Sequence, residues 1–440
     1  MGKKIRVLMV NSDAQGVGHF RNIWPAQAIQ KYHSDEFEVE INGQPNLDNI
    51  EYLKDFDIIH FHRHLGPNEK ESENFDKLKK EGVTLIMDLD DYWEPFYAHP
   101  MYQIIKQEGI SEKIRGTLPK ADYVTTTTSI FAEEVSKFNS NVKVIPNAVD
   151  PNSKMWRDND TRLEGDERCR ISWIGGSSHF DDLMLMQHSM KLLHGNKELK
   201  DKYQLLLCGF DTRGTITEID QLGRRKSRPI KPHETIWNKF EQIFTGGKIK
   251  ASGDSPNSYE ESYSDIKYDE DYTKWLYKIE KKEKFNVLEK NYVRRWTLPL
   301  TQYAKHYDYC DVCLAPLNHI DEIKTPKGQL IKKENVFNKV KSELKIIEAG
   351  MKKKTLIAQD FGIYSELIVN GVNGILIPTD KNSKEWYKAM RRVISDKDLR
   401  DRMAENLHKF VVEKYDIKNV TRERVDFYKK IVEEKRAATS

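Results

Sequence analysis

The stretch VKSELKIIEAGMKKKTLIAQDFGIYSELIVNGVNGILIP, residues 340–378, decides the fold class of this chain. Its apolar pattern predicts a helix from about Lys341 to Lys352, followed by strands at TLIA and ILIP. The loop DFGIY, residues 360–364, separates the two strands. Helices that alternate with strands predict a parallel sheet with crossover connections, so this stretch is one part of an α/β domain.

The same alternation extends outward over most of the 440 residues. The strand-like segments of the second half include RCRISWIGG, QLLLCGF and CDVCLAPL. Those of the first half are IRVLMVNS, FDIIHFHR, VTLIMDLDD, ADYVTTTT and VKVIPNAVD. The sequence therefore predicts an α/β protein with two Rossmann-like domains, joined by a linker at residues 146–151.

Residues 211–293 break this rhythm and are interpreted as an insertion in the second domain. They contain a basic cluster at 224–231 and an aromatic and acidic stretch at 259–272. The insertion is either a solvated loop or a surface for an acceptor or partner, and the sequence leaves both readings open.

Composition narrows the function classes. The chain has 72 basic and 69 acidic side chains, a net charge of +3, so its overall field does not indicate nucleic-acid binding. No segment approaches the roughly 20 apolar residues of a membrane span. With four cysteines and no export signal, we expect a cytoplasmic protein. Cys310 and Cys313 should point to opposite faces of a strand, which argues against a shared metal.

Polar residues follow several strands of the first half, where open α/β sheets bind ligands. Gly16 and Gly18 allow a tight turn after the first strand and bring helix amides to an anion. His60 lies near the end of the next recognised strand, where it could hydrogen-bond a substrate. The MDLDD motif at 87–91 clusters three carboxylates that could hold a cation, share protons, contact hydroxyl groups or cap a helix.

The second half carries the features of a diphosphate and ribose site. Gly175 and Gly176 end a strand, and His179 leads into a helix, which is a turn suited to phosphate. Lys341 and Lys345 share one helix face and could reach a diphosphate. A carboxylate facing a cleft, as expected of Glu348, suits the two hydroxyls of a ribose.

These motifs give the chain a family resemblance. PNAVD at the linker, IGG after the first strand of the second half, and E-A-G-x-x-K-x-x-x-I-A-x-D-x-G-x-Y-x-E-x-I-x-x-G-x-x-G at 348–374 resemble the retaining GT-B glycosyltransferases of group 1 (family 4-like). That superfamily includes sucrose synthases and lipopolysaccharide mannosyltransferases. The resemblance covers residues 5–210 and 294–430, is specific at 341–378, and suggests a phage or polysaccharide-type branch.

The resemblance implies a GT-B fold and a hexosyl-type glycosyltransferase (EC 2.4) of polysaccharide biosynthesis. The donor would be a UDP- or GDP-sugar, the reaction would retain the anomeric configuration, and no metal or tightly bound cofactor would be needed. The expected domains are an acceptor-side domain at 1–149, a nucleotide-sugar domain at 150–395, and helices at 396–440 that pack back toward the first domain.

Expected site residues follow from the motifs and the resemblance together. Glu348 would hold the donor ribose, and Gly18 would lie near the donor diphosphate. The expected catalytic residues are Asp90, His60 and Lys341. The expected donor-binding residues are Gly16, Gly18, Gly175, Gly176, His179, Arg294, Lys345, Glu348 and Tyr364.

Three departures from the family pattern put the chemistry in question. Val340 stands where the first glutamate of the family's E-x7-E motif would fall. GGSSH at 175–179 lacks the basic pair for the donor phosphates, which Lys341, Arg294 or Arg295 would replace. Asp90 occupies the position of the histidine near the sugar.

Other readings therefore stay open. The chain could be a phage-type enzyme that glucosylates DNA bases, a sugar-nucleotide epimerase of the same fold, or a non-catalytic GT-B binding protein. Asp88, Asp90 and Asp91 could also form the metal motif of the GT-A fold. The acceptor is a glycan, a lipid-linked molecule or a nucleic acid, and peripheral membrane contact is conceivable.

Overall fold

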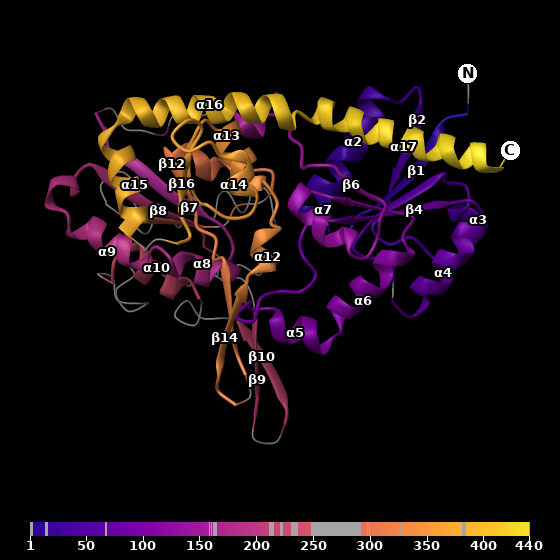
Figure 1. Ribbon diagram of the computed structural model, residues 1–440, viewed down its shortest axis with the longest axis horizontal. Coiled ribbons are helices and arrows are strands. Elements are labelled where there is room, and N and C mark those ends of the chain that lie inside the picture. The colour runs from indigo at the N-terminus through magenta and orange to yellow at the C-terminus, as the bar shows by residue number, and fades with distance from the viewer. Residues whose placement is uncertain are drawn as a thin grey trace.

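The computed structural model contains two α/β domains side by side, bridged by long C-terminal helices (Figure 1). This arrangement confirms the predicted fold class. The structure describes residues 3–13, 16–66, 68–157, 159, 161, 165–210, 215–220, 223–229, 236–247, 292–296, 298, 300–325, 327–380 and 384–439.

The first domain is built on a parallel six-stranded sheet in the order β2-β1-β3-β4-β5-β6. Its strands are β1 Ile5–Val10, β2 Phe37–Ile41, β3 Ile58–His62, β4 Thr84–Leu89, β5 Tyr123–Thr126 and β6 Val142–Val144. Its helices are α1 Gly16–Gly18, the π-helical turn His19–Ile23, α2 Trp24–Tyr32, α3 Ile50–Leu53, α4 Asn68–Lys80, α5 Tyr102–Gln107, α6 Ile110–Thr117, the 3₁₀ turn Leu118–Lys120 and α7 Ser129–Ser136.

The second domain has its own parallel six-stranded sheet, in the order β11-β8-β7-β12-β15-β16. The strands are β7 Cys169–Ile174, β8 Tyr203–Phe210, β11 Tyr292–Trp296, β12 Val312–Ala315, β15 Thr355–Gln359 and β16 Ile375–Ile377. The helices are α8 Phe180–Met184, α9 Gln187–Gly195, α10 Trp237–Phe244, α12 Val336–Lys339, α13 Leu344–Met351, α14 Ile363–Leu367 and α15 Lys384–Ser395. Short 3₁₀ turns lie at Lys154–Trp156, Ser177–His179, Lys197–Leu199 and Tyr303–Tyr309.

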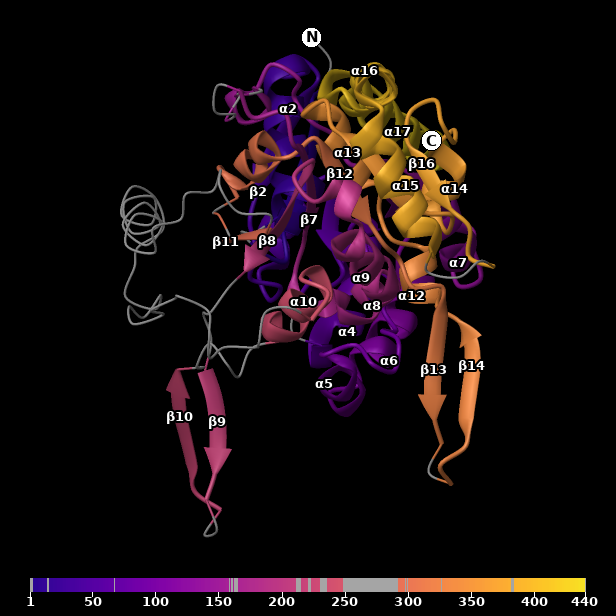
Figure 2. The same cartoon turned by 90° about the vertical axis from the view of Figure 1, so that its left-hand side faces the viewer.

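Two antiparallel hairpins leave the second domain. They are β9 Thr215–Ile219 with β10 Arg225–Pro229, and β13 Ile320–Lys324 with β14 Leu330–Glu334. Figure 2 shows both hairpins pointing in the same direction from opposite sides of the domain. Part of the predicted basic cluster therefore lies on the β9–β10 hairpin, whereas the stretch 259–272 lies outside the described residues.

The C-terminal helices connect the two domains. Helix α16, Lys397–Tyr415, packs on the second domain, where Leu407 and Val411 join the core that contains Ile346. Helix α17, Ile417–Thr439, crosses to the first domain, where Tyr428 joins the core of the first sheet. None of the helices in the described residues is long and apolar enough to cross a membrane.

One expectation about the cysteines was wrong. The Sγ atoms of Cys310 and Cys313 lie 3.5 Å apart instead of on opposite faces of one strand. Cys310 ends the 3₁₀ turn before β12 begins at Val312, so the two residues do not follow strand alternation. Both thiols are free and buried.

Candidate functional site

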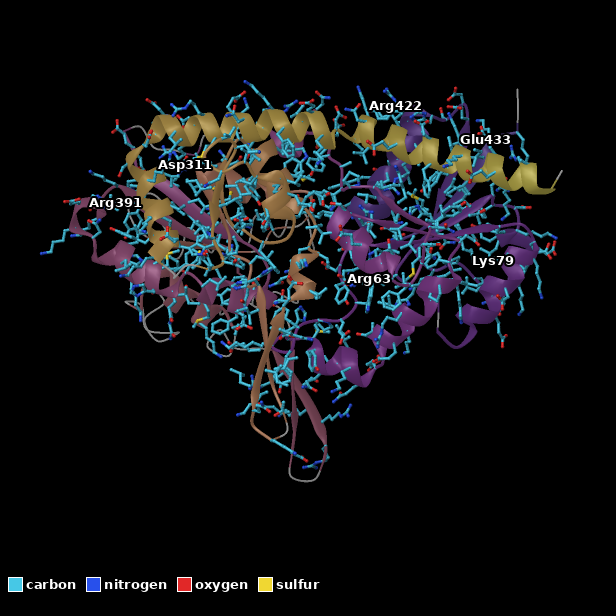
Figure 3. The ribbon with its side chains drawn as sticks, viewed as in Figure 1. Arg63, Lys79, Asp311, Arg391, Arg422 and Glu433 are labelled. Atoms are coloured by element: carbon cyan, nitrogen blue, oxygen red, sulfur yellow. The ribbon has the colours of Figure 1, made fainter. Side chains whose placement is uncertain are left out.

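A compact polar cluster lies where β1, β3 and β4 end. His62 Nε2 is 2.7 Å from Asp90 Oδ1, and the other ring nitrogen is 2.6 Å from the Ser12 hydroxyl. Arg63 donates to the same Asp90 oxygen at 2.9 Å. Figure 3 shows Arg63 on the side of the first domain that faces the second. The carboxyl ends of neighbouring parallel strands thus bring these groups together, as expected for a ligand site.

The backbone of Arg63 is held in an unusual conformation. Its φ of 59° lies in the left-handed region, which residues other than glycine seldom adopt. The Arg63 amide donates to the Asp88 carbonyl at 3.0 Å, which extends the β3–β4 ladder beyond the strands. Such strain is concentrated at functional sites, so it marks Arg63 as a residue whose position matters.

The pKa values of Asp90 and its neighbour Asp91 are shifted in opposite directions. Burial opposes ionisation of Asp90, but Arg63 and His62 hold its pKa well below the ordinary value. Partial burial and the adjacent Asp90 carboxylate raise the pKa of Asp91, while Arg63 and Lys341 oppose this increase. Neighbouring carboxyls with separated pKa values are typical of sites that bind charge or move protons.

Lys341 belongs to the second domain and faces this cluster. Its charge opposes the rise in the pKa of Asp91. Burial, followed by the Lys341 charge, lowers the pKa of His99 in the first domain to about 4. Burial and Lys341 also lower the pKa of His179 in the second domain. The Lys341 charge therefore acts on titratable groups of both domains.

The turn at 175–179 is shaped by close backbone contacts. Gly209 has a φ of 97°, and a Cβ there would lie 2.2 Å from the Gly175 carbonyl oxygen. A Cβ on Gly175 would meet the Trp173 ring at 2.6 Å. Both positions need glycine, and Gly176 beyond them is exposed.

His179 is held at the end of this turn by Asp182. Its Nδ1 lies 2.6 Å from one oxygen of Asp182. The other oxygen accepts hydrogen bonds from the Asn318 amide and the Asn338 side chain, at 2.6 and 2.9 Å. Asp182 thus holds the His179 ring, and the hydrogen bonds from Asn318 and Asn338 hold Asp182.

Glu348 lies in α13 with one oxygen already bonded. Its Oε2 accepts from the Tyr307 hydroxyl at 2.5 Å and from Lys345 Nζ at 2.8 Å. Burial and the Glu348 charge raise the pKa of both Tyr303 and Tyr307 well above the ordinary value. Tyr364, also nearly buried, has its pKa raised by burial and then by Asp182 and Glu348. These contacts fix the carboxylate and leave Oε1 for a ligand, as far as the described residues show.

The glycine loop of the first domain approaches the second domain. A Cβ on Gly18 would lie 1.8 Å from the Asp13 carbonyl oxygen, so the turn closes only with glycine at this position. The Gly18 amide donates to the Asp13 carboxylate at 3.1 Å. The nearest atom to a Cβ on Gly16 would be a methyl carbon of Leu300, which belongs to the other domain.

The structure does not bring His60 into this cluster, contrary to the expectation that it faces substrate. The side chain is fully buried, and its two ring nitrogens contact the hydroxyls of Tyr428 in α17 and Thr125 in β5. Burial lowers the pKa of His60 to about 4. The position is structural because α17 covers the middle of β3.

Asp88 is likewise committed to the interior. Its two oxygens accept a bidentate pair of hydrogen bonds from Arg21, at 2.9 and 2.7 Å, and one also accepts from Thr125 at 2.5 Å. Asp88 therefore faces Arg21 in the interior, whereas Asp90 and Asp91 both face Arg63, at 2.9 and 3.6 Å. In the described parts of the chain, no group of three or more His, Cys, Asp or Glu side chains is arranged to hold a metal ion.

The two candidate arginines on β11 differ. The side chain of Arg294 lies outside what the structure describes. Arg295 is buried, with its guanidinium 3.6 Å from the centre of the Tyr309 ring. The Tyr309 ring holds the Arg295 guanidinium at the edge of the sheet, and a role of Arg295 toward the donor phosphates stays a prediction.

Sequence reasoning missed several members of the site. His60 was proposed as the site residue of this strand, although His62 and Arg63 lie nearer its end and so closer to the crevice. His99 and Tyr307 had no local signal, because each lies in an irregular or 3₁₀ segment.

A buried chain of hydrogen bonds joins the two domains at residues 146–151. Glu343 at the start of α13 accepts from the Asn147 amide at 2.7 Å. The Asn147 side chain in turn accepts from Arg21 at 3.3 Å. Burial raises the pKa of Glu343 to about 7.

Comparison with known proteins gives the class. HepE from Anabaena, solved with UDP-glucose, aligns with a TM-score of 0.52 at 13% identity, over 97% of this chain and 100% of that one. Sucrose-phosphate synthase from Thermosynechococcus elongatus aligns with a TM-score of 0.57 at 12% identity, over 98% and 99%. A glycosyltransferase from Rickettsia africae aligns with a TM-score of 0.54 at 12% identity, over 98% and 99%. The fold is that of the GT-B glycosyltransferases.

The second domain also resembles a known family. Residues 344–410, which include α13 and most of α16, match the model of the family "glycosyl transferases group 1". The fold and this match together make the chain similar to the group 1 glycosyltransferases. No curated protein sequence matches the chain.

Proposed function

We propose that the chain transfers a hexosyl group from a UDP- or GDP-sugar to an acceptor hydroxyl, retaining the anomeric configuration and needing no metal. The observation that carries the proposal is Glu348, a nearly buried carboxylate fixed by Tyr307 and Lys345 within the segment that matches the family. A fixed carboxylate with an available oxygen is suited to the two hydroxyls of a ribose.

The donor diphosphate would lie between the 175–179 turn and Lys341. The turn offers exposed backbone at Gly176 and Ser177, and Lys341 supplies a positive charge that already reaches His179. Preorganised amides and cations stabilise the charge that develops on a leaving diphosphate. The Gly16–Gly18 turn would close the site from the first domain, and Tyr364 would support Glu348.

The sugar and acceptor would meet the His62–Arg63–Asp90 cluster. Asp90 stays ionised because Arg63 and His62 lower its pKa, and an anion near the anomeric carbon favours an oxocarbenium-like transition state. His60 is left out of this mechanism because it is buried beneath α17.

Val340 stands at the position of the missing first glutamate and has a packing role there. Val340 is fully buried and packs in the hydrophobic core of the first domain, although it belongs to the second. A carboxylate at this position would be buried against apolar groups at a cost of several kcal/mol. In this chain the position joins the two domains, and a sugar contact would have to come from another residue.

The test is donor binding and turnover by a Glu348→Gln variant. The amide retains an acceptor for Tyr307 but loses the charge that Lys345 and a ribose diol would share. We expect donor affinity to fall by about tenfold to a hundredfold, as for the loss of a hydrogen bond to a charged group. Calorimetry with UDP, GDP and their sugars, with and without a chelator, measures both affinity and metal dependence.

The matched control is Glu405→Gln on α16, which makes the same chemical change at an exposed glutamate that pairs with Lys353. This control should bind donor as the wild-type chain does. If Glu348→Gln binds and transfers sugar at the wild-type level, the donor site has been assigned wrongly.

A further inference from the structure

The β9–β10 and β13–β14 hairpins define one end of the molecule. Both point away from α16 and α17, and the two views agree on this direction (Figures 1 and 2). Helix α5 of the first domain lies at the same end. We call the two hairpins and α5 the hairpin end.

The β13–β14 hairpin is basic in its outer half. Residues 323–333 contain four lysines and no acidic residue. Lys332 pairs with Glu322 at 2.6 Å in the middle of the hairpin, and Lys333 lies 3.6 Å from Asp321 nearer its base, so both lysines are neutralised. Lys324 and Lys327 are exposed and form no ion pair with the described residues.

The β9–β10 hairpin repeats this arrangement. Arg224 pairs with Asp220 at 2.7 Å, and Arg228 pairs with a glutamate of β9. Arg225 and Lys226 between them are exposed, and neither forms an ion pair with the part of the chain that is described. Within the described residues, each hairpin therefore carries two positive charges without an ion-pair partner, and the two hairpins extend in the same direction.

Apolar side chains accompany these charges. Leu330 and Ile331 on β14 are 51% and 45% exposed. Met101 and Ile104, next to and within α5, are 44% and 47% exposed. Half of the eight large apolar side chains that are exposed in the described chain thus lie at the hairpin end. Single exposed apolar residues are common on protein surfaces, but a group of them marks an interaction site.

We propose that the hairpin end docks onto an anionic lipid surface. The unpaired lysines and Arg225 contact the headgroups, and Leu330 and Ile331 enter the interfacial layer. A nucleic acid would attract the same cations but offers a duplex surface of phosphates with no partner for the aliphatic pair. A membrane interface accepts both the cations and the apolar side chains. This docking goes beyond sugar transfer and does not depend on it.

Vesicle binding by the full chain tests the proposal in the absence of any donor. We expect binding to phosphatidylcholine vesicles that also contain phosphatidylglycerol, weaker binding as salt is added, and no binding to phosphatidylcholine alone. The double variant Lys324→Gln, Lys327→Gln should lose about 30-fold in affinity, since each cation contributes about 1 kcal/mol near an anionic surface. The double variant Leu330→Ser, Ile331→Ser should also bind more weakly, and added salt should not restore the difference.

The control is Arg402→Gln with Lys409→Gln on α16, at the opposite end of the molecule. It removes the same charge and should bind vesicles as the wild-type chain does. Thermal unfolding shows whether each variant keeps its fold. No binding to anionic vesicles, an equal loss in the control, or an unchanged Leu330 and Ile331 variant overturns the proposal. Tight binding of duplex DNA in place of vesicles does the same. Loss of transferase activity alone leaves vesicle binding unaffected, so the two proposals fail separately.

Discussion

Glu343 is a buried carboxyl whose ionisation should set part of the pH dependence of stability. Its Oε1 is bonded to the Asn147 amide, and its Oε2 has no hydrogen-bond partner in the described structure. Burial raises its pKa to about 7, whereas an unfolded glutamate titrates near 4.5. The protonated form is therefore favoured by folding, and this stabilisation is complete below pH 4.5 and lost as the pH rises through 7.

The variant Glu343→Gln keeps the acceptor for Asn147 and removes the ionisation. The unfolding free energy of the variant minus that of wild type should be about 3 kcal/mol larger at pH 8 than at pH 4. This value comes from a pKa shift of 2.5 units at about 1.36 kcal/mol each. Urea unfolding across this pH range measures the difference. Glu433→Gln on the exposed face of α17 is the control and should give parallel curves. A Glu343→Gln curve parallel to wild type would contradict the assigned pKa shift.

Single residues show where sequence reasoning reached its limit. Glu348 and Asp90 were singled out because strand ends and helix faces follow from local periodicity, and their roles stay predictions. The burial of His60 was not, since it depends on Tyr428, 368 residues away in the sequence. No pattern near residue 60 indicates which distant helix will cover it.

At the scale of the element, the ends of β7 and β8 approach each other so closely that position 209 requires glycine, which a substitution can test. Gly209→Ala would place a Cβ 2.2 Å from the Gly175 carbonyl, at a φ of 97° that alanine seldom adopts. We expect a loss of at least about 2 kcal/mol in stability from backbone strain and the clash, and weaker donor binding because the 175–179 turn must move. Thermal unfolding and calorimetry measure the two effects.

Gly116→Ala in α6 provides the comparison. A Cβ there meets nothing within 4 Å, and the position is helical. Alanine should stabilise the helix by about 0.5 to 1 kcal/mol. If Gly209→Ala unfolds at or above the temperature of Gly116→Ala, the close approach of the two strands is not a constraint.

The elements themselves were predicted unevenly. Long apolar runs gave β1, β3, β4, β7 and β8 because buried parallel strands are apolar on both faces. β2 was missed although Phe37 and Val39 alternate with exposed glutamates, since it is short and lies at the sheet edge. The β13–β14 hairpin was missed because β14 is exposed along its whole length and carries no apolar period.

At the scale of the whole molecule, the chain passes from one domain to the other twice, at the linker and at the junction of α16 and α17, and these two segments lie side by side. Val149 of the linker pairs with Asp416, through hydrogen bonds of 3.0 Å to Tyr415 and 2.8 Å from Ile417. The sequence predicted the linker at 146–151 but not its partner, because the pairing joins residues more than 260 positions apart. A narrow double crossing is a natural hinge for domain closure.

Phe337 should hold the domains together away from this hinge. Its ring, in α12 of the second domain, lies 5.8 Å from Phe96 and 5.2 Å from His99 of the first. Aromatic pairs contribute about 0.5 to 1.5 kcal/mol each, so Phe337→Ala should shift the ligand-free molecule toward open forms by about 2 kcal/mol. We expect a larger radius of gyration in small-angle scattering and donor affinity reduced by about tenfold, because the closed form becomes rarer.

Scattering is needed beside affinity because Lys341 Nζ lies 5.5 Å from the Phe337 ring, so the variant could weaken donor binding directly. Phe138→Ala is the matched control, since Phe138 packs on Trp93 within the first domain and contacts no ring among the described residues of the second. It should leave the scattering unchanged. If Phe337→Ala and wild type scatter alike without ligand while donor affinity falls, then Phe337 acts on the site through Lys341 and closure is governed by the double crossing at Val149 and Asp416.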